Sequence, residues 1–158
     1  MDFGLVKELR SEETSVTVSG EVLGTPEAIS PEAIQGKIIG PPADLYAIGC
    51  LGCFLLTGRL PYDAHTSAEY YSAHLYQDPI SPSARGVEVS PDLQALLLQC
   101  LEKDPRDRPR SSFVLRESLL ACQDAGLWTE SDARIWWGDY RAGVSPPDAE
   151  SSGSTIAT

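Results

Sequence analysis

The sequence predicts a mainly α-helical protein, and two observations support this prediction. Several stretches repeat apolar residues at the three- and four-residue spacing of a helix, and each has a recognisable start or stop signal. The alternating pattern of a strand, by contrast, occurs only in a short run at residues 15–18. With 42% hydrophobic and 22% charged residues, the 158-residue chain has the composition of one soluble globular domain.

The first forty residues contain many hydroxyl side chains and turn formers. Residues 5–23 show no long periodic element, and residues 24–42 form a turn cluster, GTPEAISPEAIQGKIIGPP, with prolines at positions 26, 31, 41 and 42. We expect an ordered loop in this cluster, with a short helix near residues 31–35.

A central helix is predicted from Asp44, or the residue before it, to Thr57, with Gly58 as its stop. Its sequence, DLYAIGCLGCFLLT, is apolar around nearly the whole circumference of the helix. Such a helix should be enclosed on all sides by other elements. Where those elements are lacking, a large apolar patch would face water. Asp44 stands at the entrance, where its simplest role is to cap the helix.

Four further helices are expected after the central one. Thr66 and Glu69 form the pattern of a capping box that opens a helix to about Tyr76, and Ser90 and Pro91 open another that stops before Asp104. The last two are predicted at residues 111–122 and 130–140. The expected apolar contacts are Leu93, Leu96, Leu97, Cys100 and Leu101, then Phe113, Val114, Leu119 and Leu120, and finally Ile135, Trp136 and Trp137.

The charge and the apolar runs exclude several classes of function. A net charge of −11 and a pI near 4.5 argue against binding to DNA, RNA or an anionic membrane, because phosphate contacts need clustered Lys and Arg. No signal peptide is visible, and the apolar run at residues 45–56 falls short of the roughly 20 residues that cross a bilayer. We therefore expect a cytoplasmic protein with no membrane segment in this chain.

The four cysteines favour a structural role over a chemical one. Cys50 and Cys53 have the spacing of a zinc or redox pair, but no second pair of Cys or His lies at similarly tight spacing. A free cysteine on a buried helix behaves as a small apolar residue. The sequence thus favours reduced thiols in a reducing compartment.

Six short motifs occur in order along the chain. They are Asp2-Phe3-Gly4, Gly24-Thr25-Pro26, Ser30-Pro31-Glu32, DLYAIG at residues 44–49, LTGRLPY at residues 56–62 and DPRDRP at residues 104–109. Each is weak alone. In this order and at these spacings, they resemble the second half of the catalytic domain of a bacterial eukaryotic-type serine/threonine protein kinase, over roughly residues 2–122.

This resemblance implies a truncated kinase-like C-terminal lobe without the N-terminal lobe. The partial kinase domain would occupy residues 1–122, with an activation segment at residues 2–32 and lobe helices at residues 42–122. A helical, Trp-rich extension at residues 123–142 and a disordered tail at residues 143–158 would follow it.

The resemblance also implies roles for the residues of the activation segment. Asp2 is expected to hold the Mg²⁺ that bridges the phosphates of ATP, Phe3 to pack as the switch residue, and Gly4 to give the backbone freedom. Thr17 and Ser19 look like regulatory phosphorylation sites, although ordinary loop hydroxyls are an equal alternative.

Four further residues match structural or catalytic positions of the family. Thr25 matches the threonine that contacts the catalytic machinery, and Asp44 the residue whose carboxylate holds the backbone of the catalytic loop. Glu32 and Arg108 match the partners of a buried ion pair that ties the end of the activation segment to the last helices.

Other parts of the kinase machinery are not found in these 158 residues. The sequence contains no Gly-x-Gly-x-x-Gly over a strand, no Val-Ala-x-Lys and no His-Arg-Asp loop with its Asn. Because phosphoryl transfer depends mostly on positioning and electrostatics, we expect this chain alone to bind neither Mg²⁺ nor ATP and to be inactive.

Two interpretations of the function stay open. The chain is either the C-terminal part of a serine/threonine protein kinase, or a degenerate kinase relic that serves as a non-catalytic protein-binding module. In the first case its partners are ATP, a protein substrate and the missing N-terminal half of the kinase. Extending the reading frame upstream of Met1 distinguishes the two, because a kinase first half there supports the first interpretation.

Overall fold

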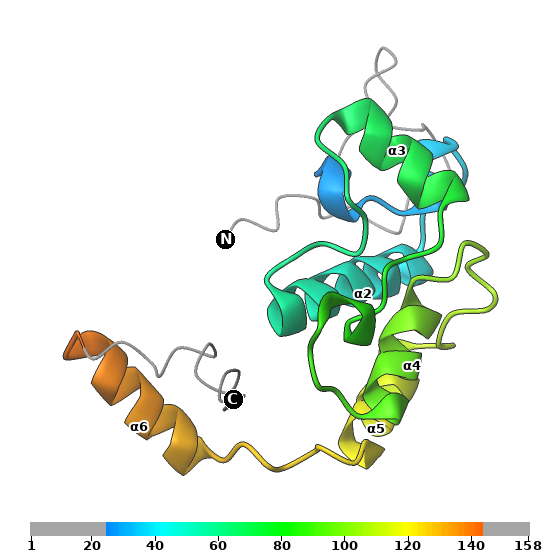
Figure 1. Ribbon diagram of the computed structural model, residues 1–158. Helices are drawn as coiled ribbons and strands as arrows, with labels where there is room; N and C mark the ends of the chain where they lie inside the picture. Colours follow the sequence, from blue (N-terminus) through cyan, green and yellow to red (C-terminus); the bar gives the residue numbers. More distant parts are fainter. Residues whose placement is uncertain (1–24, 144–158) are drawn as a thin grey trace, which may run out of the picture.

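The computed structural model describes residues 25–143, and all regular structure within that range is helical (Figure 1). In chain order the elements are η1 (Pro26–Ala28), α1 (Pro31–Ile34), α2 (Pro41–Thr57), α3 (Ser67–Tyr76), η2 (Ser83–Arg85), α4 (Pro91–Cys100), α5 (Ser112–Ala121) and α6 (Glu130–Arg141). The prediction of a mainly helical protein is confirmed for these residues. The strand predicted at residues 15–18 lies outside them.

The core forms where α4 packs closely against one side of α2. Gly49 allows this approach, because a Cβ atom at this position would lie only 2.9 Å from Cβ of Cys100. The buried side chains at this contact are Leu45, Tyr46, Cys50 and Cys53 of α2 with Leu96, Leu97 and Cys100 of α4. On either side of this pair, α5 packs on α4, and α3 packs on η1 and α1.

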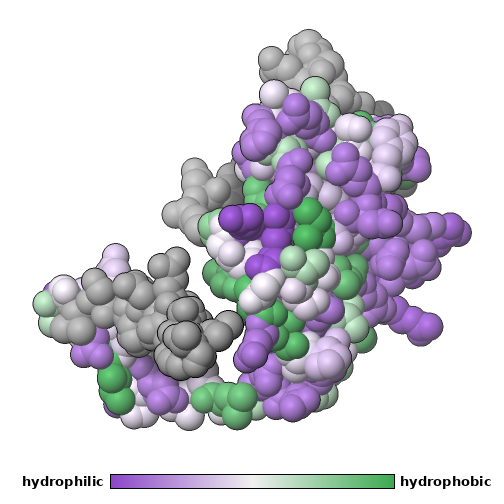
Figure 2. Space-filling view, in the orientation of Figure 1, coloured by the Kyte–Doolittle hydropathy of each residue, from purple (hydrophilic) through white to green (hydrophobic). Residues whose placement is uncertain are grey.

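The other side of α2 faces solvent, so the helix is not enclosed on all sides within the described residues. An apolar patch faces water instead, which is the outcome expected where covering elements are lacking. Figure 2 shows hydrophobic residues at the surface in the middle of the molecule, where Figure 1 places α2. The neighbouring helices cover only one side of a helix that is apolar on both. The exposed residues are Ile48, Leu51, Phe54 and Leu55, from 39% to 73% accessible.

The helix ends differ from their predicted positions in two places. Helix α2 begins at Pro41, because proline is tolerated in the first turn. Asp44 therefore lies inside that turn and is not the cap. Helix α4 ends at Cys100 and does not continue towards Asp104. The chain turns there, so that the carbonyl oxygens of Glu102 and Lys103 accept hydrogen bonds from Arg108.

Other start and stop signals are confirmed. Gly58 adopts the left-handed φ of +67° and its N–H donates to the carbonyl oxygen of Phe54 at 2.8 Å, which ends α2. Thr66 and Glu69 form the predicted capping box of α3, in which the Thr66 hydroxyl accepts from the Glu69 N–H and the Glu69 carboxylate accepts from the Thr66 N–H, both at 3.2 Å.

The apolar contacts predicted for the last two helices are mostly wrong. In α5 the buried side chain is Leu115, whereas Phe113, Val114, Leu119 and Leu120 are exposed. In α6 no residue is buried, and the expected anchors Ile135, Trp136 and Trp137 are between 38% and 61% accessible. Figure 1 shows α6 standing apart from the other helices, at the end of the connection formed by residues 122–129.

Candidate functional site

A buried ion pair joins two segments that lie 76 residues apart in the sequence. Arg108 donates from Nη1 and Nη2 to the two carboxylate oxygens of Glu32, each at 2.8 Å, and both side chains are almost inaccessible to solvent. The guanidinium carbon also lies 4.8 Å from the ring centre of Tyr46. This parallel, two-bond geometry is the strongest form of an Arg–carboxylate contact.

Backbone carbonyl groups complete the surroundings of Arg108. Its Nε donates to the Glu102 oxygen at 2.8 Å, its Nη1 to the Pro42 oxygen at 2.8 Å and its Nη2 to the Lys103 oxygen at 3.3 Å. Together with the two bonds to Glu32, all five N–H donors of the guanidinium have a partner. Arg108 therefore fixes α1, the start of α2 and the end of α4 relative to one another.

The local chain places Glu32 for this contact. Pro31 begins α1, and Glu32 follows in the first turn, where the helix dipole favours a negative charge. Burial alone would raise the pKa of Glu32. The hydrogen bonds and charge of Arg108 outweigh burial and hold the pKa below its usual range, so the carboxylate is ionised.

A chain of buried polar side chains runs beside the ion pair. The His74 Nε2 lies 3.0 Å from the Pro26 carbonyl oxygen, which can only accept, so this nitrogen carries the proton. The His74 Nδ1 then accepts from the Tyr46 hydroxyl at 2.7 Å. Tyr62 follows, with its hydroxyl oxygen 3.2 Å from that of Tyr46, and Lys103 Nζ donates to Tyr62 at 2.7 Å. This chain connects the loop at Pro26 to α2, α3 and the segment after α4.

Burial shifts the pKa values along this chain. It raises the pKa of Tyr46 well above its usual range and that of Tyr62 to about 12, so both hydroxyl groups stay protonated. It lowers the pKa of His74 to about 4 and that of Lys103 to about 8, because burial disfavours the charged forms. Neutral His74 is therefore the state that fits the hydrogen bonds.

Sequence reasoning did not identify this series of hydrogen-bonded side chains as part of the site. Its members come from four separate segments, so no spacing in the sequence connects them. The one available signal was Tyr46, a polar-tipped side chain in an otherwise apolar helix, which usually needs a hydrogen-bond partner when buried.

Two residues predicted for the site lie at its edge. Thr25 is exposed and directly precedes η1, and its carbonyl oxygen accepts from the Ala28 N–H at 3.1 Å. Asp44 is exposed in the first turn of α2. The predicted metal ligand Asp2, together with Phe3, Gly4, Thr17 and Ser19, lies outside the described residues, so their roles stay predictions.

The cysteines show no sign of metal or redox chemistry within residues 25–143. All four are free and buried, and burial raises the pKa of Cys50 to about 12 and that of Cys100 to about 11, which keeps the thiols protonated. In the same range, no three His, Cys, Asp or Glu side chains gather as a metal ion would need. No helix there is both long and apolar enough to span a bilayer.

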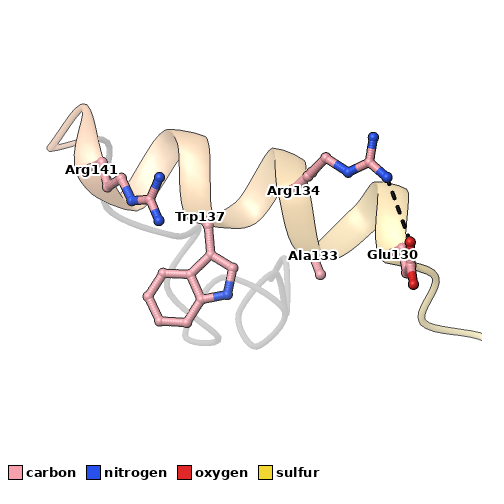
Figure 3. A pocket seen from close by; sticks show the side chains of 5 residues that line it. All are labelled: Glu130, Ala133, Arg134, Trp137 and Arg141. Atoms are coloured by element: carbon pink, nitrogen blue, oxygen red, sulfur yellow. Dashed lines mark ion pairs between the residues drawn. The ribbon is translucent and has the colours of Figure 1, made fainter.

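A surface hollow of about 430 Å³ lies on α6, away from the ion pair (Figure 3). The hollow is lined entirely by residues of this one helix, and Figure 3 shows Ala133 and Trp137 pointing to the same side of it. Because no second element closes it, the hollow has none of the enclosure of a ligand site.

Comparison with known proteins gives one consistent result. The family model described as "Protein kinase domain" matches residues 1–120. The serine/threonine-protein kinase PknB of Mycolicibacterium smegmatis is 33% identical over 120 residues, which cover 76% of this chain and 19% of that protein. The serine/threonine-protein kinase pkn3 of Myxococcus xanthus is 35% identical over 125 residues, covering 77% of this chain and 23% of that protein.

A probable serine/threonine-protein kinase of Streptomyces coelicolor is also similar, with 33% identity over 124 residues. The matches cover 76% to 78% of this chain, yet it spans only about a fifth of the length of each of these relatives.

Proposed function

This chain belongs to the protein kinase family, and we propose that it forms the C-terminal lobe of a bacterial serine/threonine kinase. In this proposal it transfers phosphate from ATP to protein serine or threonine only together with a nucleotide-binding lobe. The relatives named above are serine/threonine kinases, which supports this choice of reaction.

The observation that supports the proposal best is the buried pair of Glu32 and Arg108. A bidentate ion pair with all five guanidinium donors satisfied is costly to build and serves to hold distant segments in place. Here it holds the end of the segment that carries Thr25 and the predicted phosphorylation sites. A kinase needs that segment in one defined position when its substrate binds.

The remaining roles complete the proposal. Asp2 would bind Mg²⁺, which neutralises charge that develops on the phosphates of ATP, and Thr25 would contact the catalytic machinery. Phosphorylation of Thr17 or Ser19 would add negative charge that orders the segment if arginines face it. Asp44 would hold the catalytic loop of the preceding part of the kinase.

A chimera tests this function directly. The part of the Myxococcus xanthus relative that precedes its match to this chain would be fused to Asp2, and transfer of labelled phosphate from ATP to a general protein substrate would be measured. We expect Mg²⁺-dependent transfer by the chimera, its loss in the Asp2→Asn variant, and none by the 158 residues alone.

Two results would contradict the proposal. One is a chimera that binds ATP and melts cooperatively but transfers no phosphate, and the other is transfer by the 158 residues alone. The first result would favour the alternative, a non-catalytic binding module. The exposed apolar face of α2 is the observation that keeps this alternative open, because such faces occur at interfaces with other proteins.

A further inference from the structure

Helix α5 has an apolar outer face opposite its contact with the core. Leu115 points into the core, whereas Phe113 and Leu120 are 67% and 59% accessible. These two lie seven residues apart, so they share one side of the helix. At 100° per residue, Arg116 lies on one flank of this face and Glu117 on the other.

Helix α6 carries a complementary apolar stripe. Ala133, Trp136, Trp137 and Tyr140 follow the i, i+3, i+4, i+7 spacing of a helix that packs on a partner. The ring centres of Trp136 and Tyr140 are 5.4 Å apart and stacked, so these two side chains already lie against each other on the stripe. By the same geometry, Asp132 and Asp139 lie on one flank of the stripe, and Arg134 and Arg141 on the other. Glu130 also lies on the arginine flank, one turn before Arg134, and pairs with Arg134 at 3.6 Å.

The connection between the helices restricts where α6 can go. Cys122 is buried, and the N–H of Gln123 donates to Oδ2 of Asp92 at 2.8 Å. Oδ2 of Asp124 accepts from the N–H of Ser90 at 3.2 Å, so the chain is held on α4 up to this residue. Residues 125–129 then span about 17 Å at most. This length covers the 8–10 Å between two packed helices and keeps α6 beside the C-terminal end of α5.

The charges select one direction of packing. When two helices pack face to face, an antiparallel arrangement puts the Arg116 flank of α5 beside Asp132 and Asp139 of α6. It also puts the Glu117 flank beside Arg134 and Arg141. A parallel arrangement reverses both matches and sets like charges against each other. The short connection also requires the antiparallel direction.

We propose that α6 folds back onto the outer face of α5 in the same chain, as an antiparallel helical hairpin. In this closed arrangement the small side chain of Ala133 leaves room for Leu120, and Tyr140 covers Phe113. Arg116 pairs with Asp139, and Glu117 with Arg134. Figure 1 shows the open arrangement, with α6 apart from α5. In this arrangement Arg116 pairs with Glu117 and Arg134 with Glu130, each within its own helix.

Tryptophan emission measures this closure without a label. The only three tryptophans of the chain are Trp128, Trp136 and Trp137, so the signal comes entirely from α6 and its connection. We expect the 158-residue chain to emit at shorter wavelength, and to be less quenched by acrylamide, than the double variant Phe113→Ser, Leu120→Ser. Both substituted side chains are exposed, so far-UV circular dichroism should not change.

A charge-reversal cycle tests the pairing itself. Arg116→Asp and Asp139→Arg should each raise acrylamide quenching by about twofold, a shift that a surface ion pair of ordinary strength can produce. The double variant should restore the wild-type value. Arg59→Asp, which reverses an exposed charge away from both helices, serves as the matched control and should change nothing.

If all these variants had the emission and quenching of the unchanged chain, the proposal would be overturned. It would also be overturned if the charge-reversal double variant, Arg116→Asp with Asp139→Arg, failed to restore the original quenching. A change in emission on dilution would instead indicate that α6 docks on a second copy and would overturn the intramolecular arrangement. The closure needs no nucleotide, so its failure would leave the kinase proposal unaffected.

Discussion

At the scale of single residues, Arg108 connects more segments than any other side chain of the candidate site. Its partners are the Glu32 carboxylate and three backbone carbonyl groups. The sequence motif at residues 104–109 predicted a pair between Arg108 and Glu32, but not the three carbonyl contacts. Those contacts exist because α4 ends early and the chain folds around the guanidinium.

Replacing Arg108 with lysine should therefore destabilise the fold by about 1–3 kcal/mol, because lysine keeps the positive charge but cannot make the bidentate contact with Glu32 or reach all of the buried carbonyl acceptors. Urea unfolding followed by circular dichroism measures this loss. Arg106→Lys is the matched control, because Arg106 pairs with Asp104 at the surface, and its effect should be far smaller. Equal losses in the two variants would mean that the buried pair has no special weight.

The stability of the fold should also depend on pH through His74. Its pKa is about 4 in the folded protein, against an ordinary value near 6.5, so between these two values the unfolded chain binds more protons than the folded one. Stability should thus fall as the pH is lowered from 6.5 to 4, by an amount on the order of 3 kcal/mol.

The two histidines of the chain make this prediction easy to check. The free energy of unfolding would be measured at several pH values. Its dependence on pH should become weaker in His74→Gln and stay the same in His65→Gln, which changes an exposed position. An unchanged slope in His74→Gln would show that another group causes the dependence.

At the scale of elements, the sequence predicted the existence of the helices well and their environment poorly. Start and stop signals are local, so Thr66, Glu69 and Gly58 were interpreted correctly. The burial of a face depends on distant neighbours. Helix α2 is apolar on both sides, and nothing in its own sequence says which side a neighbour covers. The contacts of α5 were misjudged for the same reason, since Leu115 and not Phe113 faces α4.

Close packing of α2 on α4 leads to a further prediction. Gly49→Ala places a methyl group within 2.9–3.0 Å of Cys100 and Leu101, so the helices must move apart. We expect a loss of about 1–3 kcal/mol from overpacking. This loss equals or exceeds the roughly 1 kcal/mol that alanine gains over glycine in a helix.

Gly138→Ala in α6 is the matched control, because nothing lies within 4 Å of the added methyl group there. It should keep the gain in helix propensity and raise the helical signal in circular dichroism. If Gly49→Ala proved equally stabilising, α2 and α4 would not be in contact in solution.

At the scale of the whole molecule, the described residues form a half-covered core with one broad apolar face and one detached helix. The polar chain from Lys103 to Pro26 was beyond sequence reasoning, because its four side chains meet only after the helices have packed. The order of the motifs was informative in another way. It indicated the family before any contact was known, and the comparisons confirm that family.

The exposed face of α2 should bind other apolar molecules in solution. Leu51 and Leu55 lie on this face with Ile48, so a dye that reports apolar surface should bind there and fluoresce. Leu55→Ser should reduce that fluorescence severalfold without changing the circular dichroism.

Leu127→Ser is a close control, because Leu127 is 74% accessible and Leu55 is 73%, but Leu127 lies in the connection before α6. An equal reduction in both variants would mean that the dye detects scattered side chains. A reduction in Leu55→Ser alone would show that the dye binds at the apolar face of α2.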